Sequence, residues 1–250
     1  MSKNKYYESR NIKRFYVPVF IIIILFVFIV CIASKQATII PAEFRFIPVR
    51  EFDEKSCEKW IDSLDFLYGK NKSFINDYKL PSLIALSFYP ELREVVIGFI
   101  YSRESTTMAT RPDMNTILGS KRSYNIFIND DENFEGILLK DVPFNAQIGI
   151  IGHEIAHVLD YENQNLLGIM RIGIDYLNAD KKAIYEQSID MLTISKGLGW
   201  QLRDWAQYSM YDSDKATDAY KEFKRKTYMR PEQIDAAMKN NSMYQYSFNN

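Results

Sequence analysis

Histidine and cysteine are scarce in this 250-residue chain, which contains only two of each. Cys31 lies inside an apolar run and Cys57 lies beyond it, so we do not expect a disulfide between them. Two cysteines are also too few for a cysteine-rich zinc site. With only two histidines, a catalytic metal held by three of them is excluded as well.

An excess of charge of one sign is also missing. The 31 basic and 32 acidic residues leave a formal net charge of -1, so the overall charge does not favour binding to nucleic acid. The chain has no internal repeat and no glycine-rich loop suited to catalysis. Its composition, 47% hydrophobic and 25% charged, is that of a folded protein with room for one sizeable domain and an appendage.

One long apolar run lies near the N-terminus. Residues Phe15 to Ala33 include 19 positions without a charge, which as a helix would span roughly 28 Å, close to the ~30 Å hydrocarbon core of a bilayer. The tail before it, residues 1–14, has five basic residues and a single acid, Glu8. The positive-inside rule therefore predicts a transmembrane signal anchor at residues 15–33, with a cytoplasmic tail and an extracytoplasmic remainder.

Two alternatives to an anchor use the same run. A secretory signal cleaved after Ala33 is compatible with the small residues Cys31 and Ala33, but the run is longer than the roughly 7 to 15 apolar residues usual in a signal. Lipid attachment at Cys31 would need a small residue just before it, and Val30 matches that poorly. The sequence favours the anchor and shows no second span.

Beyond the anchor, residues 34–50 contain two prolines and predict an extended linker to a domain over residues 51–250. Apolar periodicity predicts helices near 51–68, 145–162, 179–195, 212–226 and 231–239, the second of them capped by Asn145. Strands are predicted near 94–102, 124–129 and 136–142. The mixed charges of 212–226 indicate a solvated helix face, and the 17 tyrosines and 16 phenylalanines are scattered as core residues would be.

Both histidines fall in one motif, Gly152-His153-Glu154-Ile155-Ala156-His157, which contains HExxH. On a helix this spacing places two imidazoles one turn apart, with Cβ atoms roughly 5 to 6 Å from each other, so both can bind one zinc ion. Glu154 does not bind the metal but can take a proton from zinc-bound water and pass it to a leaving amine. Zinc lowers the pKa of such water to roughly 7.

Coincidence is a poor explanation of this motif. Random placement would put two histidines four apart in roughly one chain in a hundred, and the glutamate lowers that frequency further. Isoleucine, alanine, valine and leucine surround the motif, which predicts a buried helix. Ionisable groups in such a helix are costly to desolvate unless a metal or partners compensate.

A catalytic zinc needs a third protein ligand, and with no histidine left it must be a carboxylate. The best candidate is Glu186, 29 residues past His157 and on a separate predicted helix. Asp190, one turn further along, is suited to accept a hydrogen bond from the far nitrogen of a zinc-binding histidine. Asp160 is the rival ligand, but it would have to bend back toward a metal already held by its own helix.

These residues resemble the gluzincins, thermolysin-like zinc proteases in which HExxH is completed by a glutamate in an ExxxD segment. The resemblance covers roughly Tyr124 to Gly199 and includes Glu186, Asp190 and Lys196-Gly197-Leu198-Gly199, a stretch similar to the corresponding helix of heat-shock-type and prenyl-protein-processing membrane proteases. It implies that the strand at 124–129 is an edge strand that aligns an extended peptide. Such proteases usually have several membrane spans, whereas this chain has one, so their substrates are not carried over.

The resemblance further implies an α+β zincin-like domain with a small mixed sheet and an active-site helix, which hydrolyses peptide bonds in a protein or peptide substrate. The family often uses a downstream His, Tyr or Arg to stabilise the oxyanion, for which Tyr176, Arg203 and Tyr208 are candidates here. Three alternatives remain open: a zinc hydrolase of another amide, a non-enzymatic membrane-anchored protein that keeps the zincin scaffold for binding or sensing, and a metal-free structural domain.

Overall fold

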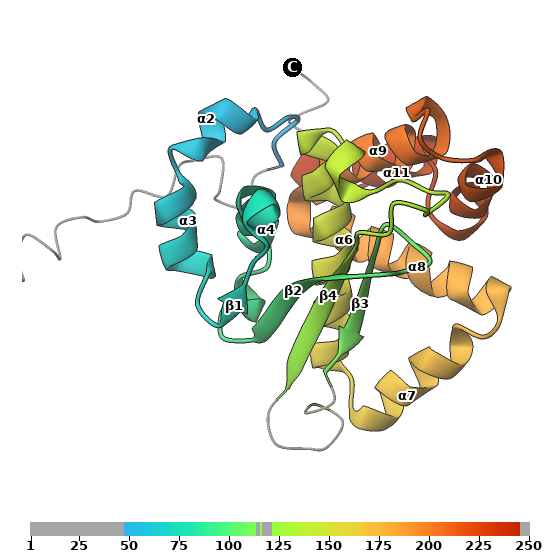
Figure 1. Cartoon of the computed structure of the whole chain (residues 1–250), viewed down its shortest axis with the longest axis horizontal. Helices are drawn as coiled ribbons and strands as arrows, with labels where there is room; N and C mark the ends of the chain where they lie inside the picture. The colour runs from blue at the N-terminus through green and yellow to red at the C-terminus, as the bar shows by residue number, and fades with distance from the viewer. Residues whose placement is uncertain (1–47, 114–115, 117–121, 246–250) are drawn as a thin grey trace, which may run out of the picture. The chain divides into compact units, whose positions relative to one another are not determined.

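A four-stranded mixed sheet and a set of helices make up the part of the chain that the computed structural model describes, residues 48–113, 116 and 122–245 (Figure 1). The strands lie in the order β1-β2-β4-β3. They are β1 (Lys72–Ser73), β2 (Val96–Ser102), β3 (Met108–Pro112) and β4 (Ser123–Asn129). Strand β4 runs parallel to β2 along seven residues and antiparallel to β3. The prediction of an α+β fold with a small mixed sheet is confirmed.

Two of the three predicted strands are present and one is wrong. The segments at 94–102 and 124–129 form β2 and β4, the two central strands. The segment at 136–142 contains a single 3-10 turn, Leu139–Asp141, and the backbone carbonyl of Ile137 accepts a hydrogen bond from the Thr107 hydroxyl instead of from a strand. The expected edge strand, β4, is internal because the unpredicted β3 pairs with its outer side.

Two helices precede the sheet strands in the chain, one lies between β1 and β2, and the others that the structure describes follow β4 (Figure 1). They are α2 (Glu54–Glu58), α3 (Ile61–Tyr68), α4 (Lys79–Leu86), α6 (Phe144–Asn163), α7 (Leu166–Asp175), α8 (Ala179–Thr193), α9 (Gly199–Gln207), α10 (Asp218–Thr227) and α11 (Pro231–Lys239). Short 3-10 turns lie at Asn76–Tyr78, Pro90–Leu92 and Ser242–Tyr244, and π-helical turns at Ile194–Leu198 and Tyr208–Asp212.

Helix α6, which contains HExxH, lies at the centre of these elements and contacts α4, α8, α9 and strand β3 (Figure 1). Its side chains are buried on nearly every side from Ala146 to Leu159, as the apolar sequence predicts. Gly149 lets the neighbouring helix approach closely, because a Cβ atom there would lie 2.2 Å from the carbonyl oxygen of Gln201 on α9. The helix is therefore fixed in position by the packing of several others.

Most of the predicted helices are present, with different ends. Helix α11 spans the predicted residues 231–239, and α8 begins after Asn178, whose side chain accepts a hydrogen bond from the Lys181 amide. Asn145 does not cap α6, since its side-chain oxygen accepts from the Phe52 amide and its nitrogen donates to Asp204. The predicted helix at 51–68 is split into α2 and α3, and α10 begins six residues later than predicted.

The anchor predicted at Phe15–Ala33, the tail before it and residues 34–47 of the linker lie outside the described residues. Among the helices within the described ranges, none has both the length and the apolar character needed to cross a membrane.

Candidate metal centre

Helices α6 and α8 bring three side chains together that could hold a metal ion. Ligand atoms of His153, His157 and Glu186 all lie within 4.8 Å of one another. The Oε2 atom of Glu186 is 3.0 Å from Nε2 of His153 and 3.3 Å from Nε2 of His157. All three residues are buried, with 4%, 4% and 3% of their surfaces exposed. Residues 33 and 29 positions apart thus meet at one point, as the sequence predicts.

These separations fit a small metal ion. Bonds of about 2.0 to 2.1 Å in a tetrahedral site separate neighbouring ligand atoms by roughly 3.3 Å. The two nitrogen-oxygen distances are close to that value, and all three ligand atoms lie within 4.8 Å of one another. The rival ligand Asp160 is engaged elsewhere, because its carboxylate accepts a hydrogen bond from the Tyr185 hydroxyl at 2.9 Å.

Asp190 lies directly behind the first histidine. Its Oδ1 atom is 2.8 Å from Nδ1 of His153, and its Oδ2 atom accepts a hydrogen bond from the backbone amide of Met229. Burial lowers the pKa of His153, but hydrogen bonds from its ring to Asp190 and Glu186 outweigh this and raise the pKa to about 10. Metal binding requires a neutral imidazole, so an ion would take the place of a proton that these carboxylates favour.

Glu186 is held from both sides. Burial opposes its charged form, but His157 and His153 hold the pKa of the carboxyl well below its usual range. Its second oxygen, Oε1, accepts a hydrogen bond from the Tyr176 hydroxyl at 2.6 Å. This contact leaves Oε2 directed at the two histidines. Of the three oxyanion candidates in the sequence, only Tyr176 lies at this centre, and it contacts the ligand Glu186.

His157 is oriented by aromatic rings rather than by a carboxylate. Its imidazole stacks on Tyr161 at 6.1 Å between centroids and lies 5.5 Å from the ring of Tyr185. Its Nδ1 atom is buried and has no hydrogen-bond partner among the described residues. The two histidines are therefore oriented by different neighbours, a carboxylate for His153 and aromatic rings for His157. The HExxH motif alone does not predict this difference.

Glu154 stands apart from the three clustered ligands. Its Oε2 atom accepts a hydrogen bond from the Thr110 hydroxyl of β3 at 2.8 Å, and its side chain is buried. The same hydroxyl lies 3.1 Å from the backbone carbonyl oxygen of Glu154. The Oε2 atom of Glu154 is thus held by the Thr110 hydroxyl of the edge strand β3 and not by the three clustered ligands.

A wide cavity of about 680 Å³ opens in front of these groups. Its lining includes Glu154, His157 and Glu186, residues of the edge strand β3 and residues of helix α7. The apolar side chains that α7 turns toward the cavity are Leu166, Ile169, Met170 and Ile172. This cavity is large enough for an extended segment of another molecule, within the usual size of ligand pockets.

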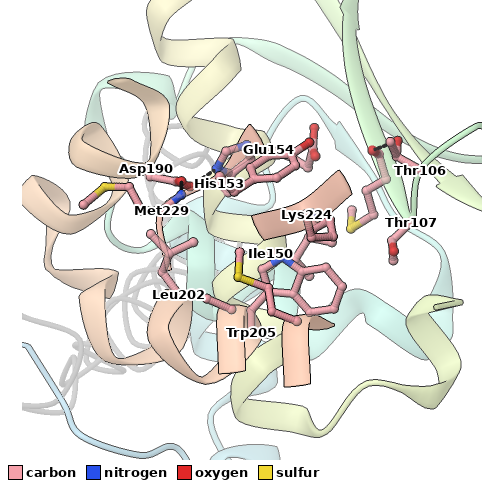
Figure 2. A pocket seen from close by; sticks show the side chains of 14 residues that line it. Thr106, Thr107, Ile150, His153, Glu154, Asp190, Leu202, Trp205, Lys224 and Met229 are labelled. Carbon is pink, nitrogen blue, oxygen red and sulfur yellow. Dashed lines mark hydrogen bonds and ion pairs between the residues drawn. The ribbon is translucent and has the colours of Figure 1, made fainter. Parts of the chain in front are cut away.

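A second, more enclosed cavity lies behind Glu154, and we call it the side pocket (Figure 2). Its volume is about 20 Å³. Helices α6, α8, α9 and α10 and the residues at the start of β3 contribute its walls. Four residues line both cavities, namely Thr106, Met108, Glu154 and Tyr228. The side pocket is therefore adjacent to the wide cavity at Glu154.

No protein-family model matches the chain, and no curated protein and no solved structure is significantly similar to it.

Sequence reasoning missed three residues that the structure places at this centre. Thr110 was missed because its strand was not predicted, and Tyr228 because nothing in the sequence separates it from the other tyrosines. Lys224 belongs to the segment predicted as a solvated helix face, yet it is buried and lines the side pocket. The remaining oxyanion candidates lie elsewhere, with Arg203 paired to Asp235 and Tyr208 bonded to the Asp141 carbonyl.

Proposed function

We propose that this protein is a zinc-dependent metallopeptidase of the gluzincin type. The observation that carries the proposal is that His153, His157 and Glu186 converge from two helices while Glu154 stays outside their cluster. Three protein ligands leave a coordination position open, as in catalytic zinc sites, whereas structural zinc sites are closed by four. The two nitrogens and one carboxylate oxygen are donors that zinc accepts.

The proton transfers fall to Glu154. A bound zinc ion would supply Lewis acidity, polarising a scissile carbonyl and lowering the pKa of a water molecule. With Oε2 held by Thr110, the Glu154 carboxylate is oriented to accept a proton from the attacking water. It would then deliver that proton to the nitrogen of the leaving amine. The hydrogen bond from Thr110 fixes the carboxylate before the substrate arrives.

Tyr228 is the best placed donor for the developing oxyanion. Its ring lies 5.6 Å from that of His153, and it lines both the wide cavity and the side pocket. Its hydroxyl makes no hydrogen bond to any of the described residues, so it is available to a substrate oxygen. Burial raises the pKa of Tyr228 well above its usual value, which keeps the hydroxyl protonated as a donor.

The edge strand supports a peptide as substrate. One side of β3 pairs with β4, and no described strand pairs with the other. An extended peptide could add to that free edge through backbone hydrogen bonds, and residues Met108 to Pro112 already form a wall of the wide cavity. We therefore propose that β3, and not β4 as the resemblance implied, is the strand that aligns an extended peptide.

We further propose that one helix, Phe15–Ala33, tethers the protein to a membrane, with the N-terminus cytoplasmic and the catalytic part outside. This part of the proposal rests on the uncharged run and on the basic residues before it.

The test is metal content together with peptide hydrolysis, measured on the full-length chain purified in detergent. We expect about one zinc ion per chain, retained in Asp160→Asn and lost in Glu186→Ala. A peptide mixture should be cleaved by the wild type and Asp160→Asn, and not by Glu154→Gln, which should keep its zinc. A wild-type chain without zinc would overturn the proposal, and zinc without hydrolysis would favour the non-enzymatic binding protein.

A further inference from the structure

The side pocket contains a buried lysine with no counter-ion. Lys224 of α10 has 4% of its surface exposed and lines the pocket beside Trp205 and Glu154 (Figure 2). Its Nζ atom lies 3.6 Å from the ring centroid of Tyr228 and 5.1 Å from that of Trp205. Within the described ranges it makes no hydrogen bond and no ion pair with any side chain.

The other charged groups of the pocket already have partners. His153 and Asp190 contact each other, and Asp190 also accepts from the Met229 amide. Glu154 accepts from Thr110. Lys224 interacts with Glu186, Asp190 and Glu154 only through space, and Lys182 repels it. It is therefore the one charge in the pocket that no direct contact to an oxygen satisfies.

A buried ammonium group without an acceptor is costly, and cation-π contacts offset only part of the cost. Burial accordingly lowers the pKa of Lys224 to about 8, which still leaves the group largely protonated at neutral pH. An anion that entered the pocket would supply the missing acceptor and form a charge-assisted hydrogen bond in a low-dielectric surrounding.

The position of the pocket indicates where such an anion would come from. Glu154, Thr106, Met108 and Tyr228 line both cavities, so a substrate held over Glu154 has its neighbouring side chain at the mouth of the side pocket. Besides Lys224, Thr107, His153 and Asp190, the remaining lining residues are apolar; they are Ile150, Leu202, Trp205, Ala206, Met210 and Met229.

We propose that the side pocket is a specificity pocket for a short carboxylate side chain, so that the substrate carries an aspartate next to the scissile bond and Lys224 binds its carboxylate. The inference rests on the proposed peptidase function and deepens it. The pocket's free volume of about 20 Å³ has room for one or two water-sized groups. This size favours aspartate over glutamate, with the flexible methionine walls adjusting to the added atoms.

The first experiment compares peptides that differ only by Asp or Asn at each position flanking the scissile bond. The two side chains have nearly the same size, so a difference reports charge. The wild type should cleave one Asp peptide with a kcat/KM at least tenfold above its Asn counterpart. Lys224→Met should lose this ratio while still cleaving the Asn peptide. Lys226→Met on the same helix, at a side chain that is 74% exposed, should keep it.

The second experiment measures binding without catalysis. Pairs of peptide hydroxamates with Asp or Asn on either side of the chelating group are titrated into the zinc-loaded wild type, Lys224→Met and Lys226→Met. In the wild type and in Lys226→Met, we expect one Asp compound to bind at least tenfold more tightly than its Asn partner. In Lys224→Met, the same Asp compound and its Asn partner should bind with equal affinity. Thermal melting confirms that each variant is folded.

The possible results distinguish a failure of this inference from a failure of the proposed peptidase function. If peptides are hydrolysed but neither assay shows a preference for Asp, the inference is overturned and the proposed peptidase function stands. The same conclusion follows if the preference for Asp persists in Lys224→Met. An Asp preference in hydroxamate binding with no hydrolysis of any peptide would support the side pocket and overturn the peptidase.

Discussion

The Oδ1 atom of Asp190 lies 2.8 Å from the Nδ1 atom of His153, across the interface between α8 and α6. One turn earlier on α8, Glu186 faces the opposite nitrogen of the same ring. A single helical turn thus provides both a candidate metal ligand and the group that orients the ring. The position of α8 relative to α6 therefore controls the geometry of the whole centre.

Replacing Asp190 by Asn should weaken metal binding by about 10- to 100-fold, because the carboxylate that fixes the ring orientation of His153 and raises its basicity is lost. The amide can still accept from the Met229 backbone through its oxygen, so the fold should persist. Competition with a chromophoric chelator measures the affinity. Asp160→Asn is the matched control, since Asp160 bonds Tyr185 and not a histidine ring. Equal affinities in the two variants would contradict the assignment.

Replacing Tyr228 by Phe should lower kcat by about 100-fold with unchanged zinc content, if its hydroxyl stabilises the oxyanion. KM should change little, because the lost hydrogen bond belongs to the transition state. Steady-state kinetics on a single cleaved peptide gives both values. Tyr208→Phe is the control, as that hydroxyl donates to the Asp141 carbonyl away from the metal centre. A kcat within threefold of wild type would remove Tyr228 from the mechanism.

Helices α6 and α8 were predictable because the sequence patterns that indicate them are local. Apolar residues fill α6 around HExxH, and the apolar periodicity of residues 179–195 predicted α8 (Ala179–Thr193). The pairing of β2 with β4 was not predictable, since strand order depends on contacts distant in sequence. Strand β3 was missed because Met-Ala-Thr-Arg-Pro is short, has no clear alternation and ends in proline, which is disfavoured within sheets.

The same limit applies to the candidate site. His153, Glu154, His157 and Glu186 follow from motif and elimination, but Thr110 comes from the missed strand. Lys224 stands among charged neighbours in Lys-Glu-Phe-Lys-Arg-Lys, so composition predicts a solvated face. Its burial depends on how α10 packs on α8, which the sequence of α10 alone does not encode.

Gly149→Ala should destabilise the protein by about 3 kcal/mol or more, because the new Cβ would lie 2.2 Å from the Gln201 carbonyl oxygen and 2.7 Å from the Leu202 amide nitrogen. Backbone atoms cannot rotate away, so α9 would have to shift from α6. Gly173→Ala is the matched control on α7, since nothing lies within 4 Å of its added Cβ. Helix propensity should make that variant neutral or more stable by up to about 1 kcal/mol. Urea unfolding of both variants measures the difference, and similar stabilities would refute the close contact.

Lys224 should leave a signature in the pH dependence of stability. Its pKa is lowered from 10.5 to about 8 in the folded protein. Between these values the folded chain has released the proton while the unfolded chain still holds it, so the unfolded state binds more protons and stability rises with pH. Relative to Lys224→Met, the free energy of unfolding of the wild type should therefore rise between pH 8 and 10.5, by up to roughly 3 kcal/mol.

Urea titrations of the wild type, Lys224→Met and Lys226→Met across this range measure the effect, with Lys226→Met expected to follow the wild type because its side chain is exposed. Saturation with the tight-binding Asp hydroxamate should shift the rise to higher pH, since a carboxylate beside Nζ favours the charged form. The Asn hydroxamate should leave it where it is. Parallel curves for the wild type and Lys224→Met would show that the ammonium is solvated, and the side pocket would then have no buried charge with which to bind an acid.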